Sequence, residues 1–154
     1  GLPTAHLLIL GDGPERPRVE EAARRLALTA RVHLAGHRAD PRPDYRAMDV
    51  FLISSDTEQM PVALLEAMAC GLPVVSSDVG DVKQILAAVQ TQGVVPAEAA
   101  FLGIKLAGLL RDRTAARAFG DANLEKVGRD YTFEGMVGAY RELYTAALAH
   151  SPKA

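Results

Sequence analysis

The chain has 154 residues, of which 49% are hydrophobic and 23% charged, and its formal net charge is −2 at pH 7. This length suits one domain with a substantial buried core. The near-neutral charge lacks the basic footprint of a nucleic-acid-binding protein, and a 5% aromatic content leaves few platforms for stacking bases.

Cysteine and membrane signals narrow the class of protein further. Cys70 is the single cysteine, so no internal disulfide can form, and no Cys/His cluster has metal-ligand spacing. The first residues carry no basic segment followed by an apolar one, and no apolar run approaches the ~20 residues of a membrane span. We therefore expect a cytoplasmic protein with no bound metal, no nucleic-acid partner and no membrane span.

Short apolar runs alternate with helical patterns along the first two thirds of the chain. Strands are predicted at 6–11, 31–36, 49–53, 74–77 and 93–96. Helices are predicted at 15–29, 61–70 and 80–89, with a helical turn at 45–48. This alternation is typical of a parallel sheet covered on both faces, which binds ligands at the carboxyl ends of its strands. The loops that should line this rim are 11–14, 36–44, 54–60 and 76–81.

The remainder of the chain is predicted to be helical, near 97–111, 114–127 and 133–149. The last helix carries an apolar stripe formed by Met136, Val137, Tyr140, Leu143, Tyr144 and Ala147. A similar stripe in the first helix contains Val19, Ala22, Ala23, Leu26 and Ala27. We expect one domain over 1–128, followed by a C-terminal helix and tail over 129–154.

The segment 54–75 contains the residues of most chemical interest. Pro61 is expected at the first position of a helix, where its missing N–H costs nothing, and Gly71 ends that helix. A helix start presents unpaired N–H groups that favour a phosphate or carboxylate. Glu58 lies in the loop before this start, and Glu66 lies more than a turn inside the helix. Two carboxylates beside an anion site suit a ligand with a phosphate and several hydroxyls, such as a nucleotide sugar.

This segment resembles the E-x7-E signature of the retaining glycosyltransferases of family 4, the group 1 transferases of GT-B architecture. The resemblance extends from 7–14 through 45–51 to 140–144. It implies a Rossmann-like, doubly wound parallel sheet that forms the C-terminal, donor-binding half of a longer enzyme. It also implies transfer of a glycosyl group from a UDP or GDP type of sugar nucleotide to an acceptor hydroxyl, with retention and without an obligatory metal or cofactor.

The resemblance also implies roles for individual residues. Glu58 holds hydroxyls of the donor sugar and is the candidate catalytic residue, Glu66 holds the ribose, and the backbone from Met60 to Val62 faces the phosphate. The full donor-binding set is Glu58, Gln59, Met60, Pro61, Val62, Glu66, Gly13, His37 and Gly80. A glutamate between apolar helix residues is independently costly to bury without a partner.

Simpler interpretations of these residues remain open. Glu58 suits a solvated loop acid, and Glu66 suits a partly exposed helix face. Gly13 belongs to a Gly-Asp-Gly-Pro turn that lacks the third glycine of a dinucleotide fingerprint, so a tight strand-to-helix turn explains it better. Gly80 suits a routine turn and His37 a solvated loop histidine.

Two features depart from the family pattern. Gln59 stands where the family usually has glycine, and 78–83 reads Asp-Val-Gly-Asp-Val-Lys in place of a Gly-Gly-x-Pro-Glu type of turn. Because of Gln59 and Asp81, an alternative stays open, a non-catalytic nucleotide-binding or interaction module derived from this fold.

The segment from 47 to 82 also contains no Lys, Arg or His, although six acids occur there. The cations that stabilise the leaving diphosphate in the family come from a strand and helix that precede the start of this chain. That strand is the central one in the order 3-2-1-4-5-6. We therefore expect a sheet without its first strand and helix, an acceptor-binding N-terminal half that is missing from the chain, and no turnover by the isolated 154 residues.

Overall fold

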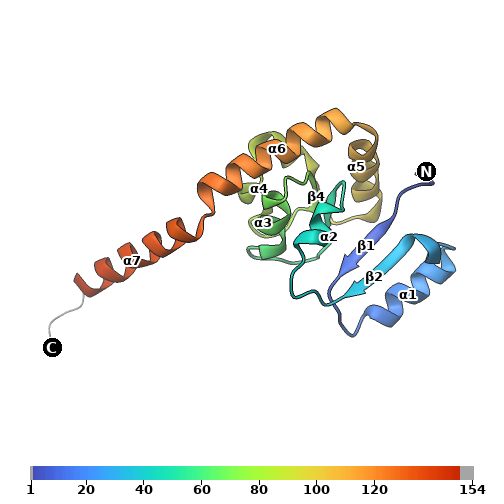
Figure 1. Ribbon diagram of the computed structural model, residues 1–154, viewed down its shortest axis with the longest axis horizontal. Coiled ribbons are helices and arrows are strands. Elements are labelled where there is room, and N and C mark those ends of the chain that lie inside the picture. Colours follow the sequence, from blue (N-terminus) through green and yellow to red (C-terminus); the bar gives the residue numbers. More distant parts are fainter. Residues whose placement is uncertain (1, 150–154) are drawn as a thin grey trace. The chain divides into compact units, whose positions relative to one another are not determined.

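Strands in the described part of the chain form two parallel sheets in the computed structural model, which describes residues 2–149 (Figure 1). In one sheet, β1 (Leu7–Leu10) pairs with β2 (Val32–Gly36). The other has the order β3-β4-β5, formed by Phe51–Ile53, Val74–Ser77 and Val94–Val95. The chain divides between Met48 and Asp49 into two compact units, each with one sheet.

Within each sheet, the neighbouring strands are ones that the predicted Rossmann-like order 3-2-1-4-5-6 also pairs. The pair β2-β1 has the adjacency expected of strands 3 and 2, and β3-β4-β5 has that expected of strands 4, 5 and 6. Among residues 2–149 no further strand pairs with β1 or β3, and no ladder joins the two sheets. The predicted parallel α/β fold is confirmed, with its strands paired as two sheets.

The first unit contains one long helix. This is α1 (Arg16–Arg25), and two shorter helical segments follow, the 3-10 helix η1 (Thr29–Arg31) and α2 (Arg42–Arg46). Helix α1 ends before the predicted limit at residue 29. The short helix α2 begins three residues before the predicted turn at 45–48.

The early end of α1 has a local cause. Ala27 has a φ of 54°, and its N–H donates to Arg24 O at 3.0 Å. Leu28 N–H donates to Ala23 O at 2.8 Å, so the two bonds close the helix as a Schellman motif. The prediction that placed Leu26 on the apolar stripe is wrong, because Leu26 follows the helix and is 60% exposed.

Helices account for most of the second unit (Figure 1). They are α3 (Val62–Ala69), α4 (Val82–Ile85), the 3-10 helix η2 (Ala88–Gly93), α5 (Ala99–Arg111), α6 (Arg113–Asp130) and α7 (Phe133–Ala149). The predicted helix at 80–89 is wrong as a single element. Leu86 and Ala87 adopt extended ψ angles of 151° and 144°, which separate α4 from η2.

The central strand β4 is buried along its whole length. Successive side chains of a strand point to opposite faces, so Val74 and Val75 enter different apolar clusters. Val74 packs in a cluster with Leu64, Met68, Val82 and Ile85 of the helices α3 and α4. Val75 packs with Val95 and with Leu102 of α5. Burying a side chain of this size completely contributes about 1.5–3 kcal/mol to the free energy of folding. Both faces of the three-stranded sheet are therefore covered by apolar side chains, as predicted.

A buried glutamine extends the pairing of β4 ahead of the first residue of β5. Gln90 is fully buried, accepts a bond from Val74 N (3.1 Å) and donates one to Val74 O (3.0 Å). The side-chain amide of Gln90 therefore supplies the two hydrogen bonds to the Val74 backbone that a neighbouring strand would otherwise supply. Gly93 allows this approach, because a Cβ there would lie 2.5 Å from Val74 O and 2.8 Å from Gln90 Nε2.

Helix α6 packs against the turn at Gly71 and Leu72, which connects α3 to β4. The backbone of Gly120 lies so close to the carbonyl of Gly71 that a Cβ at position 120 would overlap it. The buried Asn123 donates to Leu72 O (3.1 Å) and accepts from Ala87 N (3.2 Å). One side chain thus joins the entry to β4 with the segment between α4 and η2.

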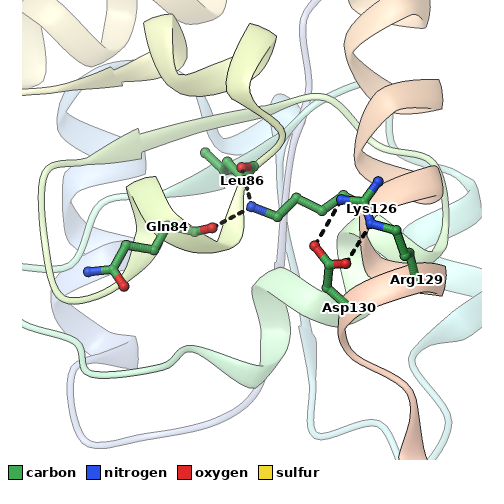
Figure 2. A network of polar contacts seen from close by, with 5 residues as sticks. All are labelled: Gln84, Leu86, Lys126, Arg129 and Asp130. Atoms are coloured by element: carbon green, nitrogen blue, oxygen red, sulfur yellow. Dashed lines mark hydrogen bonds and ion pairs between the residues drawn. The ribbon is translucent and has the colours of Figure 1, made fainter. Parts of the chain in front are cut away.

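Lys126 on α6 caps the end of α4 (Figure 2). Its Nζ donates to Gln84 O at 2.5 Å and to Leu86 O at 3.0 Å. These carbonyls lie near a helix C-terminus, where cations satisfy unpaired acceptors. One turn later Arg129 forms two bonds with Asp130, of 2.6 and 3.0 Å, and this contact lowers the pKa of Asp130 (Figure 2).

Helix α7 carries the predicted apolar stripe, but none of its described side chains is buried. The exposed members include Met136 (49%), Tyr140 (54%) and Leu143 (62%). The predicted division of the chain at residue 129 stays a prediction. No helix within residues 2–149 has the length and apolar character needed to cross a membrane.

The Gln90 contact predicts a measurable loss of stability. We expect Gln90→Leu to lower the free energy of unfolding by about 1–3 kcal/mol, because a buried N–H and C=O lose their partners. Gln92→Leu is the matched control, since Gln92 is exposed in the same 3-10 helix and its side-chain amide donates to Val89 O, three residues away. Urea denaturation followed by circular dichroism checks this. Equal stability of the two variants would contradict the role given to Gln90.

Candidate functional site

Two loops in the second unit follow the carboxyl ends of neighbouring parallel strands. The loop 54–61 follows β3 and leads into α3, and the loop 78–81 follows β4 and leads into α4. They are joined by a backbone bond of 2.9 Å from Asp81 N to Gln59 O. The rim predicted for this half of the sheet therefore has its two loops in direct contact.

Gly80 makes this contact close. It has a φ of +49°, and a Cβ at this position would lie 2.6 Å from Glu58 O and nearer still to Gln59 O. A side chain would have to displace backbone atoms, and the positive φ favours glycine independently. The structure thus brings Gly80 together with Glu58 and Gln59, three members of the predicted donor-binding set.

The carboxylate of Glu58 is held by a short chain of serine contacts. Glu58 is half-buried, and Ser55 Oγ donates to its Oε1 at 2.8 Å. The carbonyl of Ser55 in turn accepts a 2.6 Å bond from Ser77 Oγ at the buried end of β4. Glu58 is therefore oriented from two strand ends. Sequence reasoning missed both serines, although each stands at the end of a predicted strand.

Helix α3 begins beside Glu58. Pro61, predicted as the first helical residue, is instead the N-cap of α3, with φ −69° and ψ 111°, and the helix begins one position later at Val62. No side chain caps this start, so its first N–H groups are available to an anion. Pro61 is buried, whereas Val62 is 65% exposed, so solvent reaches the first turn from the Val62 side.

Glu66 projects from the outer face of α3. It is exposed, whereas its neighbours Ala67 and Met68 are fully buried, so the argument from the cost of burying a glutamate is wrong here. Residues four apart lie on the same helix face, which places Glu66 one turn below the exposed Val62. Glu66 therefore shares a face with the first turn of α3.

Gln59 and Met60 are both exposed. Gln59 keeps an ordinary negative φ, because Ala27 is the sole non-glycine residue with a positive φ among residues 2–149. The backbone here does not need the glycine that the family pattern has. Met60 is 48% exposed, so it does not pack into the core.

Gly13 and His37 belong to the first unit. Both are exposed, and both follow the ends of β1 and β2. Gly13 has no positive φ and accepts a bond from Arg16 N at 3.1 Å, which is the tight strand-to-helix turn. The adjacent backbone bond from Gly11 N to Gly36 O (2.8 Å) holds these two strand ends together.

The rim of the second unit is acidic. Asp78 and Asp81 lie in the loop after β4, and Glu58 lies in the loop after β3. Burial, with smaller effects from Asp130 and Asp81, raises the pKa of Tyr131 at the end of α6. Lys83 is the first cation after the predicted cation-free segment, and its Nζ lies 2.6 Å from Asp78 Oδ2. No group of three or more His, Cys, Asp or Glu side chains that could hold a metal occurs within residues 2–149.

Several known proteins resemble this chain. The lipopolysaccharide core biosynthesis glycosyltransferase LpsE of Rhizobium meliloti is 43% identical over 76 residues, which cover 49% of this chain and 22% of that protein. Sucrose-phosphate synthase from Thermosynechococcus elongatus superposes with a TM-score of 0.89 at 29% identity, covering 97% of this chain and 40% of that one. Anabaena HepE, solved in complex with UDP, has a TM-score of 0.83 at 21% identity, covering 94% of this chain and 42% of that one.

These matches define the fold and the family. The superpositions place the chain with one Rossmann-like half of GT-B enzymes, and the chain spans less than half the length of the relatives described above. The family model described as glycosyl transferases group 1 matches residues 2–112. Because that match covers more than two thirds of the sequence, this chain belongs to the glycosyl transferases group 1 family.

Proposed function

We propose that this chain is the C-terminal, nucleotide-sugar-binding half of a retaining glycosyltransferase. The complete enzyme moves a glycosyl group from a UDP or GDP type of sugar nucleotide to an acceptor hydroxyl, without a metal or other cofactor. The observation that carries this proposal is the contact between the Glu58 loop and the Gly80 turn at the uncapped start of α3. Family membership supports it, and so does the bound UDP in the structural neighbour HepE.

The arrangement suggests how the donor is held. Uncapped N–H groups at the start of α3 favour the phosphates electrostatically. The Glu66 carboxylate, one turn below on the same face, accepts hydrogen bonds from ribose hydroxyls. Glu58, fixed by Ser55, accepts them from hydroxyls of the transferred sugar. Bonds from hydroxyls to carboxylates are charge-assisted and orient the donor as well as binding it.

We propose the cytoplasm as the place of action, because the single cysteine, Cys70, is free, which suits a reducing compartment. The alternative of a non-catalytic module rests on Gln59 and Asp81, and Asp81 adds a negative charge to a loop of the proposed phosphate site. The binding experiment below separates the two.

Nucleotide binding tests the proposal directly. We expect saturable binding of UDP or GDP by calorimetry, weakened about 10- to 100-fold in Glu66→Ala because a bond to a charged group is lost. Glu125→Ala is the control, since Glu125 is an exposed glutamate on α6. Absence of saturable binding, or equal affinities of the two variants, would overturn the donor-binding role and favour a degenerate module.

The Gly80 turn gives a second test. We expect Gly80→Ala to destabilise the protein by more than about 2 kcal/mol, because the positive φ and the contact with Glu58 O both oppose a Cβ. It should also weaken nucleotide binding. Gly128→Ala on α6 meets nothing within 4 Å and should be neutral or stabilising. A fully stable Gly80→Ala variant with normal binding would show that this contact does not shape the site.

Catalysis needs more than this half. The acceptor site and the cations that stabilise the leaving diphosphate belong, by family resemblance, to other segments of the enzyme, and that stabilisation is generally the largest electrostatic contribution to transfer. We expect the purified 154-residue chain to bind donor without transferring its sugar. A radiolabelled-donor assay with simple alcohols as acceptors checks this, and steady turnover would contradict it.

A further inference from the structure

The charge distribution of the second unit singles out one lysine. No Lys, Arg or His occurs from residue 47 to residue 82, so Lys83 is the first cation after the two loops that form the rim. The proposed donor carries a diphosphate, and the two rim loops carry the acids Glu58, Asp78 and Asp81. An anionic ligand on an acidic rim requires a compensating positive charge.

The backbone of Lys83 is fixed by packing, whereas its side chain is exposed. Its neighbours Val82 and Ile85 are buried in the apolar cluster below β4, and Lys126 caps the end of the same short helix. The Lys83 side chain is 53% exposed, and its Nζ lies 2.6 Å from Asp78 Oδ2, itself 51% exposed. The backbone is therefore fixed, and the ammonium group remains in reach of solvent.

The turn that carries Lys83 borders the proposed donor site. Asp81 N bonds Gln59 O at 2.9 Å, and Gly80 lies against the backbone of Glu58. Lys83 follows two residues later on a flexible four-carbon stem that carries three donors. Lysine binds phosphates as a point charge, so it does not need the planar geometry that arginine requires.

We propose that Lys83, which pairs with Asp78 in this structure, is a further donor-binding residue that binds the diphosphate of the sugar nucleotide. This rests on the donor-binding function proposed above. Exposed ion pairs contribute little free energy, so Lys83 exchanges Asp78 for a diphosphate at small cost. Asp78 then competes with the ligand for the same ammonium group, which makes the two residues act on affinity in opposite directions.

Opposite effects of the two variants form the test. Binding of UDP and of uridine is measured by calorimetry with EDTA present, for the wild-type chain, Lys83→Gln and Asp78→Asn. We expect Lys83→Gln to weaken UDP binding about 5- to 20-fold and Asp78→Asn to strengthen it about two- to fivefold, with uridine unchanged in both. The effect of Lys83→Gln should shrink as salt is raised. Lys105→Gln, on α5, is the control for loss of any positive charge from the second unit.

The variants distinguish this inference from the donor-binding function on which it rests. If Lys83→Gln binds UDP as tightly as Lys105→Gln while Glu66→Ala still weakens binding, this inference falls and the donor-binding function stands. If the wild-type chain shows no saturable UDP or GDP binding, both fall. If Lys83→Gln and Asp78→Asn weaken binding equally, the ion pair merely stabilises the turn, which also overturns the inference.

Discussion

The close backbone contact between the turn after β4 and the loop after β3 is the constraint on which the site depends. One hydrogen bond, from Asp81 N to Gln59 O, and the absence of a side chain at Gly80 bring two neighbouring loops together. Because these loops leave adjacent parallel strands, their approach defines a rim. The start of α3 and the carboxylate of Glu58 are positioned by that approach.

The buried core of the second unit supports the contact between these two loops. β4 is covered by apolar clusters on both faces, and α6 contacts the segments next to β4 through Gly120, Asn123 and Lys126. These contacts of α6 fix the entry to β4 and the end of α4. The result is a rigid base with exposed polar tips, which is the arrangement that an orienting site requires.

Sequence patterns predicted the elements that depend on continuous runs of one residue type. The strand at 74–77 and the helix at 133–149 have the predicted bounds, because buried apolar runs and helical periodicity are local signals. The end of α1 was missed because Ala27, and not a glycine, takes the left-handed conformation. The exposed position of Glu66 was missed because composition around a helical residue does not say which face is covered.

Contacts between distant residues lay outside the reach of sequence reasoning. Ser77 bonds Ser55, and Gln90 bonds Val74, through side chains whose separation in the sequence carries no signal. The loops themselves could be predicted, since a parallel sheet places them at one rim. Their mutual contact through Gly80 could not, because a turn glycine has the same pattern whether or not another backbone lies against it.

Amide chemical-shift mapping by NMR tests the central claim most directly, because it reports which backbone groups meet a ligand. With UDP added to the isotopically labelled chain, the account predicts saturable shifts that concentrate at Val62 and Ala63, at Gln59 and across 80–83. Saturable shifts confined to residues 2–48, or no saturable shifts with either UDP or GDP, would contradict it.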